Sequence, residues 1–172
     1  MLKQARVSII MGSTSDMPVM QEAAKILDHF KIPFEINALS AHRVPEQVMD
    51  FAKNAAANGI RVIIAGAGGA AHLPGVVAAL TPLPVIGVPC RSTISLDGWD
   101  SLLSIVQMPP GVPVATVGID AGQNAGILAV QMLSTGDEQL LQEMLAFKEK
   151  LKLKILKANE DLQQFKFAYK VN

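Results

Sequence analysis

The sequence has few cysteine, charged or aromatic residues, and the first two shortages bear on the class of protein. The single cysteine, Cys90, excludes a disulfide framework and a CxxC metal or redox site. The 15 Lys and Arg balance the 15 Asp and Glu, which argues against nucleic acid as a partner because nucleic-acid-binding domains usually carry a basic excess. Charged residues make up only 17% of the chain. We therefore expect further copies of the chain to cover part of its surface.

Signals for export or for a membrane span are also missing. Residues 1–7 lack the apolar run and small-residue cleavage site of a secretory signal. Residues 62–90 contain no Asp, Glu, Lys or Arg, but glycines and prolines interrupt them throughout. A spanning helix needs about 20 uninterrupted residues. We interpret this segment as buried protein interior, and we expect a cytoplasmic protein without membrane contact.

Short aliphatic runs alternate with helical patterns along the chain. The runs predict strands over 7–11, 34–39, 61–65, 84–88 and 113–118, and the helical patterns cover 17–30, 45–58, 97–107, 123–133 and 138–166. Near-continuous aliphatic strands are typical of a parallel sheet that is covered by helices on both faces. The sequence therefore predicts one doubly wound, three-layer α/β domain of the flavodoxin-like kind over residues 1–172.

The last predicted helix is longer than a sheet of ordinary strands requires. Over residues 138–168 it carries a broad apolar surface together with five lysines between Lys148 and Lys157. We interpret the lysines as a solvated face. The helix should protrude, with its excess apolar surface packed on a neighbouring subunit.

Three polar clusters follow the first three predicted strands. They are GSTSD at 12–16, SAHR at 40–43 and GAGGAAHLPG at 66–75. In an open parallel sheet, ligands bind beyond the carboxyl ends of the strands. The three clusters should therefore face one crevice.

The first cluster has the features of an anion site. Ser13 and its neighbours offer hydroxyls, and the following helix presents free N–H groups and a positive dipole end that favour phosphate. Helix capping by Ser15 or Asp16 would also place polar residues here, although capping explains one such residue and not four in a row. Asp16 cannot bind phosphate because of its own charge, but it suits a ribose hydroxyl.

In the second cluster, His42 and Arg43 are adjacent. Arginine binds phosphate in a bidentate manner, and histidine exchanges protons near neutral pH. A loop histidine beside a surface arginine explains the pair equally well.

The third cluster satisfies the GxGxxG/A pattern through Gly66, Gly68 and Ala71. No acidic residue follows about 20 positions later, as dinucleotide binding would require. We instead interpret the cluster as a glycine-rich loop that brings backbone amides close to a small planar ligand. His72 could contact that ligand, but from the residues alone we favour a structural role.

Motifs for a metal or for a nucleophile are not visible. The chain shows no Ser–His–acid order, no HExxH and no other metal-ligand spacing. We expect neither a metal nor a cofactor, and we assign no chemistry to His29 or Cys90.

Together the clusters resemble one family, the bacterial-type N5-carboxyaminoimidazole ribonucleotide mutases of purine biosynthesis. The matching strings are MGSTSD at 11–16, SAHR at 40–43, AGAGGAAHLPG at 65–75, DSLLSIVQMP at 100–109, GVPV at 111–114 and NA at 124–125. The resemblance covers residues 7–133, and the third string is long and unusual. It does not extend to the last helix.

The resemblance implies an isomerisation, without ATP or metal, in which a carboxylate moves from the exocyclic N5 of the ribonucleotide to ring carbon C4. His42 would be the catalytic acid and base. Ser13, Asp16 and Arg43 would bind the ribonucleotide, with Asp16 on the ribose. The remaining substrate-binding positions, around the migrating carboxylate, would be Ser40, Gly68, Ala71, His72 and Leu73. The family also forms homo-octamers.

A related carboxylase, which adds carbon dioxide directly to aminoimidazole ribonucleotide, is the nearest competing hypothesis. The resemblance places a lysine in the pocket of that branch, and residues 66–75 contain none. Two further hypotheses are a nucleotide-binding module without chemistry and a purely structural oligomer. Neither of them explains the pairing of His42 with the third cluster.

Overall fold

A computed structural model describes residues 4–171, and the chain divides into two compact units, Met1–Leu133 and Ser134–Asn172. The first unit contains a sheet with flanking helices, and the second contains the long helix α6. The elements of the first unit are β1 Val7–Met11, the short 3-10 helix η1 Thr14–Asp16, α1 Met17–His29, β2 Phe34–Ala38, α2 Pro45–Asn54, β3 Val62–Gly68, α3 Leu73–Leu80, β4 Val85–Cys90, α4 Trp99–Val106, β5 Ala115–Thr116 and α5 Gly122–Ser134, whose last residue is the first of the second unit. The second unit holds α6 Glu138–Leu162.

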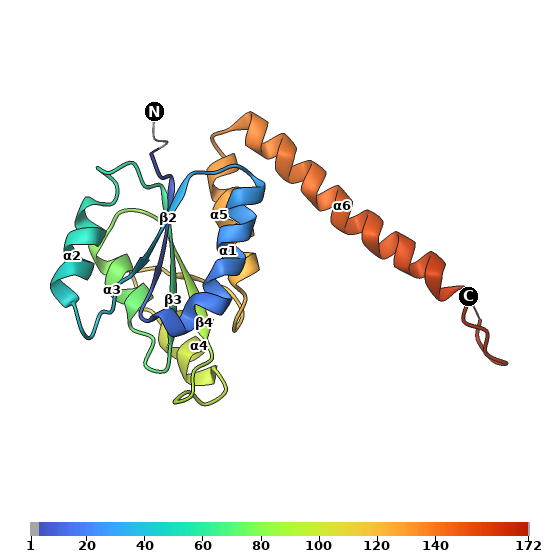
Figure 1. The fold of residues 1–172 in the computed structure, drawn as a ribbon, viewed down its shortest axis with the longest axis horizontal. Helices are drawn as coiled ribbons and strands as arrows, with labels where there is room; N and C mark the ends of the chain where they lie inside the picture. Colours follow the sequence, from blue (N-terminus) through green and yellow to red (C-terminus); the bar gives the residue numbers. More distant parts are fainter. Residues whose placement is uncertain (1–3, 172) are drawn as a thin grey trace. The chain divides into compact units, whose positions relative to one another are not determined.

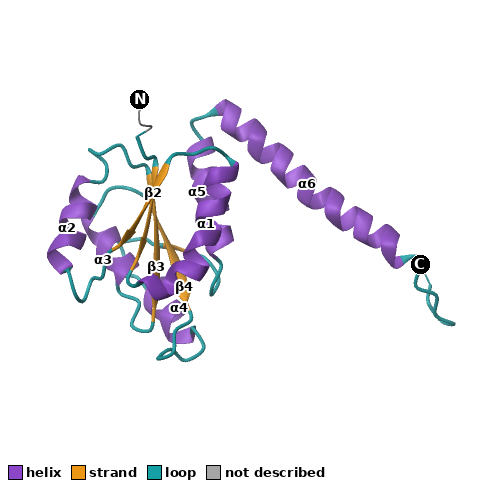
Figure 2. Ribbon diagram, in the orientation of Figure 1, coloured by secondary structure: helices purple, strands orange, loops and turns teal. Residues whose placement is uncertain are grey.

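The sheet has five parallel strands in the order β2-β1-β3-β4-β5. The central strands β1 and β4 are buried at every residue, whereas the edge strand β2 is half-buried or exposed. Helices lie on both sides of the sheet, with α2 and α3 on one side and α1 and α5 on the other (Figures 1 and 2). This arrangement confirms the predicted doubly wound, parallel α/β fold.

The third strand is longer than the sequence pattern predicts. It continues through Gly68, where it pairs with Cys90 of β4, instead of ending at residue 65. Two of the glycines that we interpreted as loop residues therefore lie in the strand. A Cβ atom on Gly66 would overlap the Met20 sulfur, and one on Gly68 would lie 3.0 Å from the Cys90 carbonyl oxygen. Glycine is needed there for close packing within the sheet and against α1.

Helix α3 was not predicted. Its sequence, LPGVVAAL, is apolar at every position, so it has no polar face to produce a helical period. It packs into a core with α2 and α4 on one face of the sheet, around Val48, Val77 and Ile105, which are each 0% exposed. Helix α2 ends at Asn54, earlier than predicted, and β5 has only two residues.

On the opposite face, α5 approaches α1 very closely. A Cβ on Gly122 would overlap the Val19 carbonyl oxygen, and one on Gly126 would lie 2.9 Å from the Ala23 carbonyl oxygen. The obstacle at both positions is helix backbone, which cannot rotate away as a side chain can. The glycines four residues apart therefore set the distance between the two helices.

Helix α6 begins at a capped end. The Asp137 side chain accepts a hydrogen bond from the Leu140 N–H at 3.1 Å. Beyond Lys150, five large apolar side chains of the helix are exposed over about half of their surface or more: Leu151, Leu153, Ile155, Leu156 and Leu162. Within residues 4–171, no helix combines the length and the apolar character that crossing a membrane requires.

We predict that Gly122→Ala lowers the free energy of unfolding by about 1–3 kcal/mol, the usual cost of overpacking a well-packed interior. Denaturant unfolding measures this change. Gly136→Ala is the matched control, because a Cβ there meets nothing within 4 Å. Equal stability of the two variants would contradict the close α1–α5 packing.

Candidate active site

A cavity of about 370 Å³ opens at the carboxyl edge of the sheet. This volume lies within the range of small-molecule sites. The cavity lies where the order of the strands reverses direction, because β1 has β2 on one side and β3 on the other. All nine residues predicted to act on substrate line it: Ser13, Asp16, Ser40, His42, Arg43, Gly68, Ala71, His72 and Leu73. The three polar clusters therefore face one crevice, as the sequence predicts.

The first cluster forms the tight turn between β1 and α1. The Ser13 hydroxyl accepts a hydrogen bond from the Ser15 N–H at 3.3 Å and caps η1. Ser13 therefore caps η1, while Asp16 occupies the N-cap position of α1, one of the two positions that the capping interpretation predicts. The Asp16 side chain makes no capping bond to α1. Its carboxyl group lines the cavity although the residue is only 5% exposed.

Burial raises the pKa of the Asp16 carboxyl above its ordinary value of 3.8, and hydrogen bonding from Ser15 and Ser13 opposes this shift without cancelling it. A carboxylate that is removed from water in this way gains from a hydroxyl donor. Asp16 is also the only carboxylic side chain among the described residues that line the cavity.

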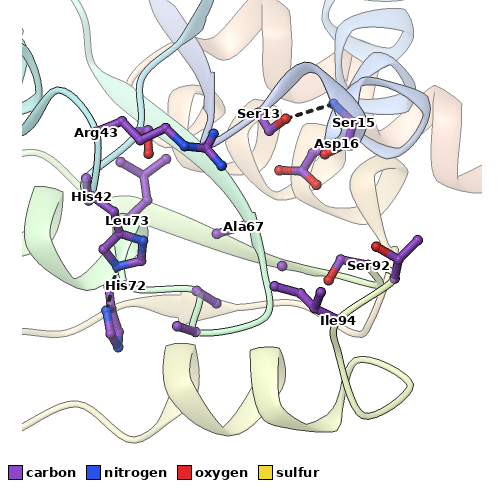
Figure 3. A pocket seen from close by; sticks show the side chains of 17 residues that line it. Ser13, Ser15, Asp16, His42, Arg43, Ala67, His72, Leu73, Ser92 and Ile94 are labelled. Carbon is purple, nitrogen blue, oxygen red and sulfur yellow. Dashed lines mark hydrogen bonds between the residues drawn. The ribbon is translucent and has the colours of Figure 1, made fainter.

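Two histidines meet at one end of the cavity. His42 Nε2 lies 2.8 Å from His72 Nδ1, and the ring planes are nearly perpendicular, at 87°. Such a bond needs one donor and one acceptor, so one of the two facing nitrogens carries no proton. Both side chains are exposed at the cavity surface. This position favours the ligand-facing interpretation of His72 over the structural one (Figure 3).

Arg43 follows His42 in the same turn. The turn closes on the Ser40 carbonyl, which accepts hydrogen bonds from the N–H groups of Arg43 and Val44 at 3.3 and 3.0 Å. The Arg43 side chain extends from the histidine side of the cavity toward Ser13 and Asp16 (Figure 3). The cavity therefore has a cationic, hydroxyl-bearing end suited to an anion and a histidine end suited to proton transfer.

The turn Gly68–Ala71 forms the cavity wall beside the histidines. Gly69 has φ +64° and Ala71 has φ +40°, and the Ala71 N–H donates to the Gly68 carbonyl at 3.3 Å. A positive φ at alanine is strained and persists only where the surroundings fix it, commonly at functional sites. The strained Ala71 immediately precedes His72.

The segment that follows β4 also lines the cavity, through Ser92, Thr93 and Ile94. The sequence alone does not identify these residues, because only the order of the strands in the sheet places the end of β4 beside β3. The preceding Arg91 fixes the segment: its N–H donates to Asp120 at 2.9 Å, and its guanidinium pairs with Asp97 at 3.0 Å. Both aspartates have positive φ.

Cys90 is not among the residues that line the cavity. Cys90 is 0% exposed, and burial, with the charges of Asp16 and Asp120, raises its thiol pKa to about 12. It is the buried small side chain that the sequence predicts. Among residues 4–171, no three His, Cys, Asp or Glu side chains gather closely enough to hold a metal ion.

The family model described as AIR carboxylase matches residues 6–154. The chain belongs to the AIR carboxylase family. This result confirms the resemblance found in the sequence motifs, and the matched range includes every residue that lines the cavity.

Several AIR carboxylase family relatives are similar over almost their whole length. The N5-carboxyaminoimidazole ribonucleotide mutase of Mycobacterium leprae is 56% identical over 166 residues, which are 96% of each chain. That of Thermotoga maritima is 53% identical over 97% of each chain. The phosphoribosylaminoimidazole carboxylase of Schizosaccharomyces pombe is 57% identical, but the match spans only 28% of that protein. The Treponema denticola PurE structure superposes with a TM-score of 0.81 at 29% identity, covering 92% of this chain and 98% of the other.

For this AIR carboxylase family member, we predict that Asp16→Asn stabilises the fold at neutral pH. Because burial raises the folded-state pKa, ionisation of Asp16 costs stability once the pH rises above the unfolded value of 3.8. The advantage of the variant should therefore be absent near pH 4 or below and grow as the pH rises through the raised pKa.

Denaturant unfolding across this pH range measures the difference. Asp50→Asn is the control, because it makes the same substitution at an exposed position of α2, where the carboxyl group is not buried. A destabilised Asp16→Asn variant at neutral pH would contradict the account of the buried carboxylate.

Proposed function

We propose that this chain converts N5-carboxyaminoimidazole ribonucleotide to 4-carboxy-5-aminoimidazole ribonucleotide without ATP. The observation that carries the proposal is the cavity itself, which brings together a histidine pair at 2.8 Å, an arginine, a serine hydroxyl and a buried carboxylate. Relatives that match nearly end to end bear the mutase name, which supports the same reaction.

One end of the cavity suits the ribose phosphate. Arg43 would hold the phosphate together with Ser13, whose neighbouring N–H groups lie at the start of η1. Asp16 would accept a hydrogen bond from a ribose hydroxyl. A hydrogen bond from the ribose hydroxyl would replace the hydration that the Asp16 carboxylate loses on burial. Nucleotide binding would therefore lower the free-energy cost of keeping this carboxylate buried.

The reaction needs one proton delivered and one proton recovered. His42 gives a proton to the exocyclic nitrogen, the bond from that nitrogen to the carboxylate carbon breaks, and carbon dioxide and aminoimidazole ribonucleotide form. The electron-rich C4 then forms a bond to the carbon of carbon dioxide, and C4 loses its proton back to His42. Atoms and charge balance without an oxidant, a metal or ATP. One histidine in two protonation states serves both steps.

The released carbon dioxide must stay beside C4. Ser40, Gly68, Ala71, His72 and Leu73 would surround it, and the small side chains among them let backbone groups come close. Excluding water strengthens each polar contact in such a pocket. The hydrogen bond between His72 and His42 would hold the His42 ring in one orientation.

A second candidate is the direct carboxylation of aminoimidazole ribonucleotide, and the carboxylase name of the Schizosaccharomyces pombe relative favours it. Against it, none of the described residues that line the cavity is a lysine, the residue expected in that branch. The two reactions share the cavity but differ in the source of the carboxylate.

We infer further that the protein is cytoplasmic and assembles into a homo-octamer, with the helix over residues 138–168 at a subunit interface. The exposed apolar side chains of α6 between Leu151 and Leu156 support an interface, because large exposed apolar surfaces mark sites of association. Light scattering of the purified protein tests this assembly. A monomer would overturn it.

We predict that His42→Asn abolishes conversion while nucleotide binding and the fold are kept, since the proton relay is lost but the phosphate end is untouched. Turnover of N5-carboxyaminoimidazole ribonucleotide and titration with aminoimidazole ribonucleotide measure the two effects. His29→Asn, at the end of α1, is the matched histidine control and should retain activity. Unaltered turnover in His42→Asn would refute the proton relay.

Labelled bicarbonate at a low level separates the two candidate reactions. A mutase should convert N5-carboxyaminoimidazole ribonucleotide rapidly with little label in the product, because the carbon dioxide stays in the pocket. Heavy label uptake, or activity only from aminoimidazole ribonucleotide at high bicarbonate, would assign the direct carboxylase instead.

A further inference from the structure

The string DSLLSIVQMP at 100–109 has no role in the reaction described above. It forms α4 and the residues that follow, and none of these residues lines the cavity. One side chain of α4 nevertheless reaches the cavity wall. The Ser104 hydroxyl donates a 2.5 Å hydrogen bond to the carbonyl of Ala70, in the Gly68–Ala71 turn.

Helix α4 is a rigid support for this contact. Ile105 is 0% exposed, and a Cβ on Gly87 of β4 would overlap its side chain, so the helix lies directly against the sheet. One turn earlier, the buried Ser101 hydroxyl donates to the Cys90 carbonyl at 3.1 Å. Ser104 is therefore presented by an element that is itself fixed to β4.

The bond from Ser104 contributes little to stability. Ala70 is exposed and Ser104 is only half-buried, so water can replace the hydroxyl at the carbonyl once it is removed. A hydrogen bond of this kind has a small net effect on the free energy of unfolding, in contrast to one whose loss leaves a buried group unsatisfied. Its consequence is geometric, because it fixes the direction of the peptide between Ala70 and Ala71.

That peptide immediately precedes the residues that lead to the histidine pair. Ala71 follows with its strained φ of +40°, and His72 comes next and meets His42 at 2.8 Å. We propose that Ser104 is a positioning residue: through Ala70 it holds the turn that closes the carbon dioxide pocket and that places His72 against His42. For its catalytic consequence this inference rests on the proposed mutase reaction.

The test compares Ser104→Ala with Ser101→Ala, a matched loss of one hydroxyl on the same helix. Ser104→Ala should lower kcat about tenfold or more with little change in KM, as a misplaced catalytic geometry does. It should also raise the uptake of labelled bicarbonate into the product, because carbon dioxide escapes from the loosened pocket. Ser101→Ala should instead lower the free energy of unfolding and leave label uptake low. Ser104→Thr, which keeps the hydroxyl, should restore low uptake.

Hydrogen–deuterium exchange of the free protein gives a readout that does not depend on the reaction. Amides of residues 69–73 should exchange faster in Ser104→Ala than in the wild type, and not in Ser101→Ala. Wild-type exchange and wild-type label uptake in Ser104→Ala would overturn the proposal, as would equal effects of the two alanine variants. Failure of the wild type to convert substrate would instead overturn the proposed function, and exchange alone would then decide whether Ser104 positions the turn.

Discussion

All five strands run in the same direction, and the functional site depends on that constraint. Every loop that leaves a strand on its way to a helix starts at the same edge of the sheet. The reversal of chain order beside β1 opens a crevice at that edge and brings together clusters that are far apart in the sequence, from Ser13 to Ile94. No single cluster could form the site alone, because the anion end combines Ser13 with Arg43 and the histidine end combines His42 with His72, which come from different loops.

Close packing of the backbone positions the loops at the carboxyl edge of the sheet. Gly66 and Gly68 allow β3 to continue beyond its aliphatic run. The turn that follows the strand therefore begins at Gly68 and leads directly to His72. The loops at this edge hold the positive-φ residues Ala71, Asp97 and Asp120. Strain at these positions is sustained by the surrounding contacts, such as the bonds of Arg91 with Asp97 and Asp120. The site is thus built from backbone geometry as much as from side chains.

The sequence alone predicts the fold class, because near-continuous aliphatic runs such as those of β1 and β4 are typical of buried parallel strands. The sequence also predicts which polar clusters meet, because each of the three clusters directly follows a predicted strand. It fails at α3, whose wholly apolar sequence has no period, and at the end of β3, where glycine looks like a loop. It misses Ser92 to Ile94 because strand order is a tertiary property. The 2.8 Å contact of His42 with His72 is equally invisible, as it depends on two separate turns.

The most direct test of the central claim is a crystal structure with aminoimidazole ribonucleotide bound. We predict the phosphate at Ser13 and Arg43, a ribose hydroxyl on the Asp16 carboxylate, and the imidazole ring between His42 and the Gly68–Ala71 turn. A nucleotide bound outside this cavity, or one lying in it with its phosphate at the histidines and its base at Asp16, would contradict the claim.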